Sequence, residues 1–451
     1  MADESEKRAK IAAEEEEEES ENENVAGEHQ EDEADENEDD EEMKIIQEEY
    51  RVWKKNAPFL YDVCLKHNLP SAPLTCQWLP PKTEVESEYS SHEILVGMKR
   101  TETVTNCLSV MKVFLPNESA ELEVKEFSDK TNELGGYAAN VSKLNSLVEI
   151  THDGDVNRAR YMPSDYFIVA TRMGHHIGIF KFDQMESKPR EGSKCKPKII
   201  GVGHSEEGYG LDWSPRTPGH LLSCGGDGTY LWNIDRSTSA PEGIQPLRTF
   251  SGSVADCAWD PFKTDVFATV SLEGKIGATK WDIRDSKPVF NIEYEGEELN
   301  SLSFNPLKEH IFVTGGSGKV VHLWDDRKIV SNKPQYELKG HMGEIYGIQW
   351  APFNENILAS CGEDRRVLIW DLERIGKEQT PEEAEDGDPE LLFSHAGHCS
   401  RVMDVSWNPN DDWVLASVAD NGEDGDLQIW QPSANIYLDE EDDDEDADDL
   451  E

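Results

Sequence analysis

Residues 357–372 read ILASCGEDRRVLIWDL, two short apolar runs on either side of a polar turn at Gly362 to Arg365. Apolar runs of this length, separated by a Gly-containing turn, predict a pair of antiparallel strands. The second run ends in the step Trp370-Asp371. The hairpin is the best-formed copy of a pattern that recurs along the chain, and this recurrence decides the fold.

Six segments share one layout, in which an aromatic residue near the end of one strand precedes a second aromatic by about twenty residues. Successive repeats are mostly 45 or 46 residues apart, a spacing typical of propeller blades with four strands each. The aromatic pairs are Tyr161 and Phe182, Trp213 and Trp232, Trp259 and Trp281, Phe304 and Trp324, Trp350 and Trp370, and Trp407 and Trp430.

These segments resemble WD repeats, and the resemblance implies a closed ring of blades. In the best copy, His341, Ser360, Asp364 and Trp370 are spaced like the buried hydrogen-bonded set of WD repeats, which is structural rather than catalytic. Residues 92–117 hold at least two further strand-like runs, and we expect LTCQWL, residues 74–79, to add the strand that closes the ring. We therefore predict an all-β, seven-bladed WD-repeat β-propeller over residues 70–438.

Charge is concentrated at the two ends of a chain whose formal net charge is −51. Residues 1–42 hold 22 acidic and 3 basic residues, and residues 439–451 hold 11 acidic and no basic ones. Both segments are predicted to be disordered acidic tails, because self-repelling runs bury nothing; that they only keep the protein soluble is the alternative. The acidic excess favours cationic partners over nucleic acid. No apolar run has the length of a membrane span, and the eight cysteines form no CxxC pair, so we expect neither membrane contact nor a disulfide framework.

Two segments lie outside the repeats. Residues 43–69 place Ile46, Tyr50 and Trp53 at helical spacing, which predicts an N-terminal helix that Pro58 bends or interrupts. Residues 373–393, ERIGKEQTPEEAEDGDPELLF, form an acidic insertion that ends in an apolar run. The plain alternatives are a packing helix and a solvated loop. Together, however, an apolar helix and an acidic loop suit a groove for a basic amphipathic helix.

A second candidate site comes from the positions six and four residues before the first aromatic of each repeat. Residues two apart share one face of a strand, so these positions are expected to form a ring around the channel mouth. Acids occupy the first position in four of the six repeats, which predicts a mouth that attracts cations, with Tyr209 and Tyr346 to stack on a guanidinium. The alternative is that they only solvate the rim. The pairs are Asp155 and Asn157, Glu207 and Tyr209, Ser253 and Ala255, Glu298 and Asn300, Glu344 and Tyr346, and Arg401 and Met403.

Over residues 43–438 the chain resembles the histone-binding WD-repeat proteins, known as retinoblastoma-binding proteins and as the small subunit of chromatin assembly factor. The motifs that carry the resemblance are EEYRVWKKNAPFLYDV at 48–63, DGDVNRARYMP at 153–163, EEGYGLDW at 206–213, EEAEDGDPELLF at 382–393 and SANIYLDEED at 433–442. The first and fourth are not general features of WD repeats, so their joint presence makes the resemblance specific.

The resemblance implies two histone sites. A side groove would bind the first helix of histone H4 through Phe59, Leu60, Glu383, Asp386, Asp388, Pro389 and Phe393. The propeller face would bind the basic N-terminal tail of histone H3 and similar peptides through Asp155, Asn157, Arg158, Glu207, Tyr209, Glu298, Asn300, Glu344 and Tyr346. The chain departs from the family pattern at Asp388, where a second proline is usual, at Ser394 (isoleucine), at Ala255 (glutamate), and at Pro70-Ser71-Ala72 (Glu-Trp-Pro).

The implied function is a non-catalytic, nuclear histone-binding adaptor, present also in the cytoplasm with newly made histones. Its partners would be histones H4 and H3 and the subunits of chromatin assembly, deacetylase, acetyltransferase, remodelling or Polycomb complexes. The sequence holds no Walker loop, GxSxG or HExxH motif, so we expect no catalytic residues, cofactor or metal. The main alternative is a generic WD scaffold, such as a ubiquitin-ligase substrate receptor or a ribosome-assembly factor. A hydrolase that uses ring carboxylates has almost no support.

Overall fold

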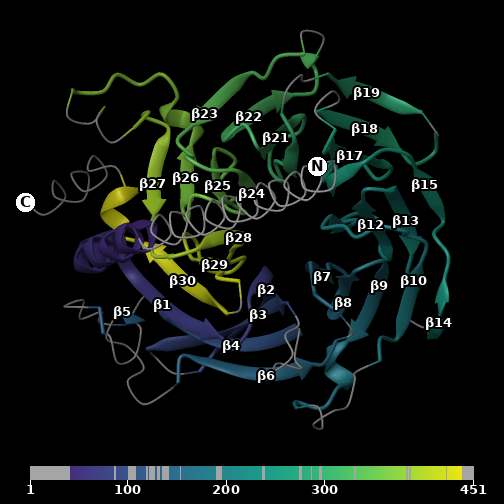
Figure 1. The fold of residues 1–451 in the computed structure, drawn as a ribbon, viewed down its shortest axis with the longest axis horizontal. Helices are drawn as coiled ribbons and strands as arrows, with labels where there is room; N and C mark the ends of the chain where they lie inside the picture. The colour runs from purple at the N-terminus through teal and green to yellow at the C-terminus, as the bar shows by residue number, and fades with distance from the viewer. Residues whose placement is uncertain are drawn as a thin grey trace, which may run out of the picture. The chain divides into compact units, whose positions relative to one another are not determined.

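Within residues 54–438, the computed structural model forms seven β-sheets arranged around one axis (Figure 1). The described residues are 41–85, 88–99, 108–117, 120, 127–128, 133–134, 142–152, 154–188, 196–235, 239–273, 277–285, 287–293, 297–329, 332–381, 384, 387–422 and 424–438. The first strands of neighbouring sheets contact one another around the axis. The predicted seven-bladed β-propeller is confirmed.

Each sheet is one blade, and its strands run outward from the axis. Blade 1 contains β2 (Pro73–Glu84), β3 (Tyr89–Met98), β4 (Leu108–Pro116) and β6 (Leu144–Ile150). Blade 2 contains β7 (Arg158–Met162), β8 (Asp165–Met173), β9 (His176–Lys181), β10 (Ile199–Val202) and β14 (Ala240–Ile244), the last parallel to β10. Blade 3 contains β11 (Leu211–Trp213), β12 (His220–Gly225), β13 (Gly228–Asn233) and β15 (Arg248–Phe250).

The remaining four blades follow in chain order. Blade 4 contains β16 (Val254–Trp259), β17 (Val266–Ser271), β18 (Ala278–Asp282) and β19 (Pro288–Ile292). Blade 5 contains β20 (Leu299–Phe304), β21 (Ile311–Gly316), β22 (Val320–Asp325) and β23 (Tyr336–Lys339). Blade 6 contains β24 (Ile345–Trp350), β25 (Ile357–Gly362), β26 (Val367–Asp371) and β27 (Leu391–His395). Blade 7 contains β28 (Arg401–Trp407), β29 (Leu415–Asp420), β30 (Gly425–Pro432), β1 (Tyr61–Leu69) and β5 (Glu133–Leu134).

The ring is closed by a segment that the sequence pattern assigned to a helix. Residues 61–69 form β1, which pairs antiparallel with β30 and completes blade 7. The run LTCQWL, which we expected to close the ring, lies instead in β2, the axial strand of blade 1. The local helical pattern was misleading because β30 offers an unpaired row of backbone groups, and strand pairing satisfies those groups together with the ones of β1. The propeller therefore begins at residue 61 rather than at residue 70.

The N-terminal helix covers residues 41–60 rather than 43–69 and ends two residues after Pro58. The chain divides between Trp53 and Lys54 into two units, so helical residues 41–53 belong to one unit and 54–60 to the other. Residues 41 and 42 are helical, whereas the rest of the two predicted acidic tails, 1–40 and 439–451, lies outside the described residues. No helix in the described part of the chain is long and apolar enough to span a membrane.

The hydrogen-bonded set predicted in blade 6 is confirmed. His341 lies with Nδ1 2.8 Å from Asp364 Oδ2 and with Nε2 2.7 Å from Ser360 Oγ, and Trp370 Nε1 donates to the same hydroxyl at 2.8 Å. Equivalent sets occur in blades 3 and 7. Each set ties three strands of a blade together beneath a tryptophan, so these histidines are structural.

One aromatic of the repeat pattern was assigned wrongly. Phe180 faces Val169 across the β8–β9 pair, as Trp232 faces Leu221 in blade 3, so Phe180 takes the tryptophan position of blade 2. Phe182 begins the short 3-10 turn η1 (Phe182–Gln184). The step Phe182-Asp183 misled the assignment because it imitates the Trp-Asp step of other repeats.

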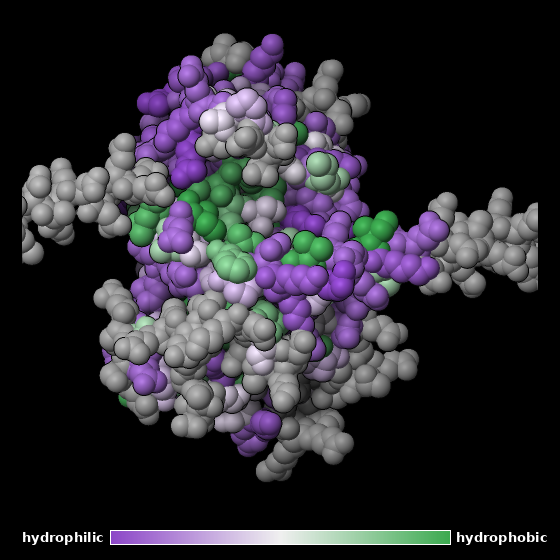
Figure 2. All heavy atoms as spheres, turned by 90° about the vertical axis from the view of Figure 1, so that its left-hand side faces the viewer, coloured by the Kyte–Doolittle hydropathy of each residue, from purple (hydrophilic) through white to green (hydrophobic). Residues whose placement is uncertain are grey.

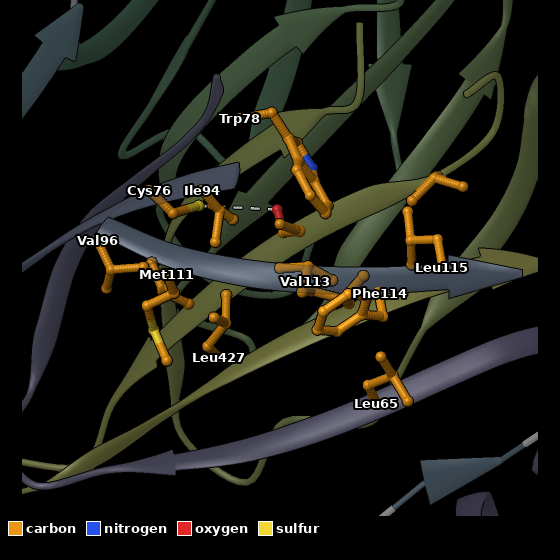
Figure 3. Close-up of a cluster of buried hydrophobic side chains, with 14 of the residues drawn as sticks. Leu65, Cys76, Trp78, Ile94, Val96, Met111, Val113, Phe114, Leu115 and Leu427 are labelled. Carbon is orange, nitrogen blue, oxygen red and sulfur yellow. Dashed lines mark hydrogen bonds between the residues drawn. The ribbon is translucent and has the colours of Figure 1, made fainter. Parts of the chain in front are cut away.

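Neighbouring blades are held together by bonds from tryptophan indoles and by apolar packing. Four indole Nε1 groups donate to backbone oxygens of the preceding blade: Trp213 to Arg160, Trp259 to Asp212, Trp350 to Ser303 and Trp407 to Gln349. Figure 3 shows the core between blades 7 and 1, where Leu65, Trp78, Val113 and Leu427 converge from β1, β2, β4 and β30. Burying an aliphatic or aromatic side chain stabilises the fold by about 1.5–3 kcal/mol, so this core supports the closure by β1.

Candidate functional site

The predicted ring at the channel mouth forms one cavity of about 430 Å³, which we call the mouth. All seven blades contribute to its wall. Of the predicted residues, Glu298 does not line the mouth; it is exposed, next to β20. The predicted residues that do line it are Asp155, Asn157, Arg158, Glu207, Tyr209, Asn300, Glu344 and Tyr346.

A β-bulge aims one residue of several axial strands at the mouth. In five blades the strand register shifts where the position four residues before the first aromatic is passed, which leaves that residue unpaired. Bulges bend a strand and redirect side chains. The residues left unpaired are Leu74, Ala255, Asn300, Tyr346 and Met403. Simple alternation predicted the face correctly, but it missed this device.

Carboxylates and phenols lie close together in the mouth. Burial raises the pKa of the Tyr346 phenol, and the carboxylates of Glu363 and Glu344 raise it further. Burial likewise raises the pKa of Tyr209, with added effects from Glu207 and Asp155. An aromatic ring beside carboxylates offers a guanidinium or ammonium group both a stacking face and an opposite charge.

Arg158 points away from a ligand at the mouth. Its Nη1 lies 3.3 Å from Asp404 Oδ1 and its Nη2 lies 3.9 Å from Asp256 Oδ1, at the top of a second cavity of about 250 Å³ along the axis. We call this cavity the axial channel. Because Arg158 is engaged by these buried carboxylates, its charge anchors the floor of the mouth.

Asp404 is the centre of the buried ionic network in the axial channel. Arg160 Nη2 lies 3.2 Å from Asp404 Oδ2, and Thr75 Oγ1 donates to the same oxygen at 2.8 Å. Burial acts to raise the pKa of the Asp404 carboxyl, but Arg160 and Arg158 outweigh it, so the pKa lies below its ordinary value. Blades 7, 1 and 2 are thereby linked through one carboxylate.

Asp212 lies in the same channel in the opposite electrostatic situation. Its Oδ2 accepts a hydrogen bond from the Trp259 backbone N at 2.7 Å, which links blade 3 to blade 4. Burial raises its pKa to about 7, although the Trp259 bond favours the charged form. Asp212 therefore titrates near neutral pH.

Sequence reasoning missed the mouth residues that come from the second strands of the blades. Lys99, Leu272 and Asp420 line the mouth at the ends of β3, β17 and β29. Lys99 Nζ and Arg401 Nη2 lie 3.3 Å and 2.9 Å from Asp420 Oδ2. The available signal was positional, because the ends of these strands lie beside the starts of the axial strands.

The helix end is tied to the outer strand of blade 6 on the propeller side. Phe59 is 79% exposed and Leu60 is half-buried. Tyr61, which follows them, lies 2.8 Å from His395 Nδ1 through its hydroxyl and packs edge-on against Phe393 at a ring-centroid distance of 5.4 Å. Figure 2 faces this side of the molecule and shows hydrophobic surface gathered in a hollow between hydrophilic side chains.

We call the predicted H4 site on this side the side groove, and the structure describes part of it. Glu383 and Asp386 lie outside the described residues. Phe393 is 7% exposed, so it supports the groove from beneath and presents little surface of its own. Pro389 is half-buried, and the exposed Asp388 lines a separate hollow of about 840 Å³ along β23 with Tyr336. The structure therefore brings Leu60 and Phe393 together through Tyr61 and places Asp388 towards blade 5.

Metal ligation has no support from the described residues. Within them, no three His, Cys, Asp or Glu side chains are grouped in a way that would hold a metal ion. The six described cysteines are free thiols: Cys64, Cys76, Cys224, Cys257, Cys361 and Cys399.

Two family models match the chain. The model of the histone-binding protein RBBP4, also described as a component of the CAF1 complex, matches residues 48–117, a stretch that includes Phe59, Leu60 and the strands from β1 to β4. The model described as "WD domain, G-beta repeat" matches residues 332–371 and 389–431, which cover β23 to β26 and β27 to β30. The first match therefore covers the helix end at the side groove, and the second covers the strands of blades 6 and 7.

Proposed function

Because this chain belongs to the histone-binding WD-repeat family, we propose that it holds the first helix of histone H4 in the side groove and a basic H3-type tail at the mouth. It is a histone-binding adaptor, and the proposal concerns where each histone segment binds. The observation that carries the proposal is the convergence of Glu207, Tyr209, Glu344 and Tyr346 in one cavity.

The side groove suits an amphipathic helix with basic residues. Phe59 exposes most of an apolar ring, and burying such a ring in a complex contributes about 1.5–3 kcal/mol. The acidic residues of the insertion, Glu383 and Asp386 among them, supply the opposite charge that orients Arg and Lys side chains. Apolar burial would thus provide affinity, and charge would provide register.

The mouth suits an extended basic tail. Its carboxylates lower the energy of a nearby cation, and its two tyrosine rings offer cation–π contacts worth about 0.5–2 kcal/mol each. The wall comes from strands of every blade, so the site is formed before a ligand arrives and little ordering cost remains.

The H4 assignment is tested by the substitution Phe59→Asp in the full chain. We expect binding of a peptide with the sequence of the first H4 helix to weaken at least tenfold, because an apolar anchor becomes a desolvated charge. Asp386→Lys is expected to act in the same direction through charge repulsion. Val289→Asp is the matched control, since Val289 is 59% exposed on the outer strand of blade 4. Undiminished H4 binding by both groove variants would reject the assignment.

We further propose that the protein is a non-catalytic, nuclear member of chromatin assembly, remodelling or histone-modifying complexes, with no direct contact to nucleic acid. The acidic balance of the chain supports this, because it repels phosphates and attracts basic histones. Affinity purification of the full chain from nuclear extract is expected to recover histones together with other members of such complexes. Recovery of ubiquitin-ligase or ribosome-assembly components without histones would favour a generic scaffold.

A further inference from the structure

The wall of the mouth changes character from blade to blade. Blades 2 and 3 contribute Asp155 and Glu207, and blade 6 contributes Glu344. These acidic sectors are interrupted in two places. One interruption lies at blades 7 and 1, where Arg401 and Lys99 share Asp420, and the other lies at blade 4.

The interruption at blade 4 is apolar. Val254 and Ala255 are 6% and 8% exposed, and Leu272, at the end of the second strand of the same blade, is 39% exposed. All three line the mouth, and Ala255 is the residue that the β-bulge leaves unpaired. We call these three residues the blade-4 notch. The short Ala255 side chain leaves room beside Leu272 where a longer residue would fill the wall.

The surroundings of the notch disfavour a cation there. Asp256, the acid nearest in sequence, turns into the axial channel, where its oxygens accept the backbone N–H groups of Cys257 and Leu302 and lie 3.9 Å from Arg158. An incoming cation at the notch would meet apolar walls and the guanidinium below, without a carboxylate of its own.

The positions on either side of the notch are polar. Glu207 and Tyr209 stand on the preceding blade, and Asn300 stands on the following one, with Glu344 one blade further. A ligand that crosses the mouth would therefore pass from an acidic sector over an apolar one and on to a second acidic sector.

We propose that the mouth selects a linear peptide in which an aliphatic side chain lies between basic residues. The aliphatic group enters the blade-4 notch, and the basic groups lie over the sectors of Glu207 and Glu344. The inference rests on the proposed binding of basic tails at the mouth and names the sequence class that this site prefers. Charge complementarity fixes the flanking residues, and the apolar lining fixes the central one.

The test compares two synthetic peptides of about twelve residues. They share the same basic residues and differ only in a central Arg-Leu-Arg or Arg-Ser-Arg. Binding to the full-length protein is measured by fluorescence anisotropy at fixed salt, because affinities of charged peptides depend on ionic strength. We expect the leucine peptide to bind about fivefold to tenfold more tightly, the gain from burying part of a leucine side chain.

Two variants make the comparison specific. Ala255→Glu places a carboxylate in the notch and is expected to abolish the preference for leucine while binding of the serine peptide is kept or strengthened. Val289→Glu adds the same charge to the outer strand of the same blade, away from the mouth, and is expected to keep the preference.

The outcomes separate this inference from the proposed function. If both peptides bind the wild type equally, and a Glu207→Ala, Glu344→Ala double variant weakens both, the mouth binds basic tails but the notch does not select an aliphatic residue. If neither peptide binds a properly folded wild type, basic tails do not bind at the mouth and both proposals fail. A leucine preference that Ala255→Glu leaves unchanged would likewise overturn the assignment to the notch.

Discussion

The mouth draws its side chains from all seven blades, whereas the side groove draws on one helix end, one insertion and the outer strands of two blades. Mouth residues are held by strand register, by β-bulges and by the ionic network of the axial channel beneath them. Groove residues such as Phe59 are exposed and touch the fold mainly through their neighbours, above all Tyr61. Substitutions below the mouth should therefore disturb the whole ring, and substitutions at the groove should act on binding alone.

Removal of the central carboxylate is the most severe way to test this contrast. Asp404→Ala leaves Arg158 and Arg160 without their shared partner, and breaking a buried ion pair in this way costs about 3–5 kcal/mol. We expect a marked fall in the unfolding midpoint measured by calorimetry and a parallel loss of tail binding. Asp404→Asn, which keeps acceptors for Thr75 and the Cys76 backbone, should be less damaging. A midpoint unchanged in both variants would show that the network does not support the mouth.

Asp212 gives the contrast a pH dependence. Its pKa is about 7 in the folded protein and near 3.8 in the unfolded chain, so the native state binds more protons between these values. Stability from this group is therefore present below pH 4 and is lost as pH rises towards 7, with a slope of at most about 1.4 kcal/mol per pH unit. Asp212→Asn keeps an acceptor for Trp259 and should remove the slope.

The measurement is the difference in unfolding free energy between wild type and Asp212→Asn from pH 4 to pH 8. The difference matters because His204, whose burial lowers its pKa to about 4, gives a slope of opposite sign between pH 4 and 6.5 in both proteins. The variant should gain on the wild type as pH rises and run parallel to it above pH 7.5. A constant difference across this range would mean that Asp212 stays ionised in the fold.

A double substitution at the rim separates the two sites. Glu207→Ala with Glu344→Ala should weaken binding of a basic H3-type peptide at least tenfold, about 1.4 kcal/mol, because both carboxylates line the mouth. Binding of the H4 helix by the same variant is the internal control and should be unchanged. Isothermal titration at two salt concentrations would measure both, and the H3 effect should shrink at high salt. An equal loss of H4 binding would contradict the independence of the two sites.

The smallest effect is expected at the link between the helix end and blade 6. Tyr61→Phe removes the hydroxyl that lies 2.8 Å from His395, which should reduce the free energy of unfolding by about 1 kcal/mol. Packing against Phe393 is kept, so H4 binding should change less than twofold. Chemical denaturation of both proteins would measure the stability change. A large loss of H4 binding would instead make this hydrogen bond part of the groove.

The repeat pattern identified the propeller from the chain alone because each blade needs the same aromatic and turn residues. His341, Ser360, Asp364 and Trp370 could be placed in one set by spacing, and Glu207 and Tyr209 on one face by alternation. Arg158 shows the limit of this reasoning. It lies at the position expected of a mouth residue, yet Asp404 and Asp256 from other blades turn its guanidinium down into the axial channel.

What the sequence determined by itself was the local rule: short apolar strands, polar turns, and acids at one repeated position. The tertiary structure decided which edge each strand completes and which side chains meet. Residues 61–69 became a strand because β30 presented an open edge, and the blade-4 notch arose where a bulge at Ala255 met Leu272 from the neighbouring strand. Both depend on contacts between distant parts of the chain, and local propensity carries no information about such contacts.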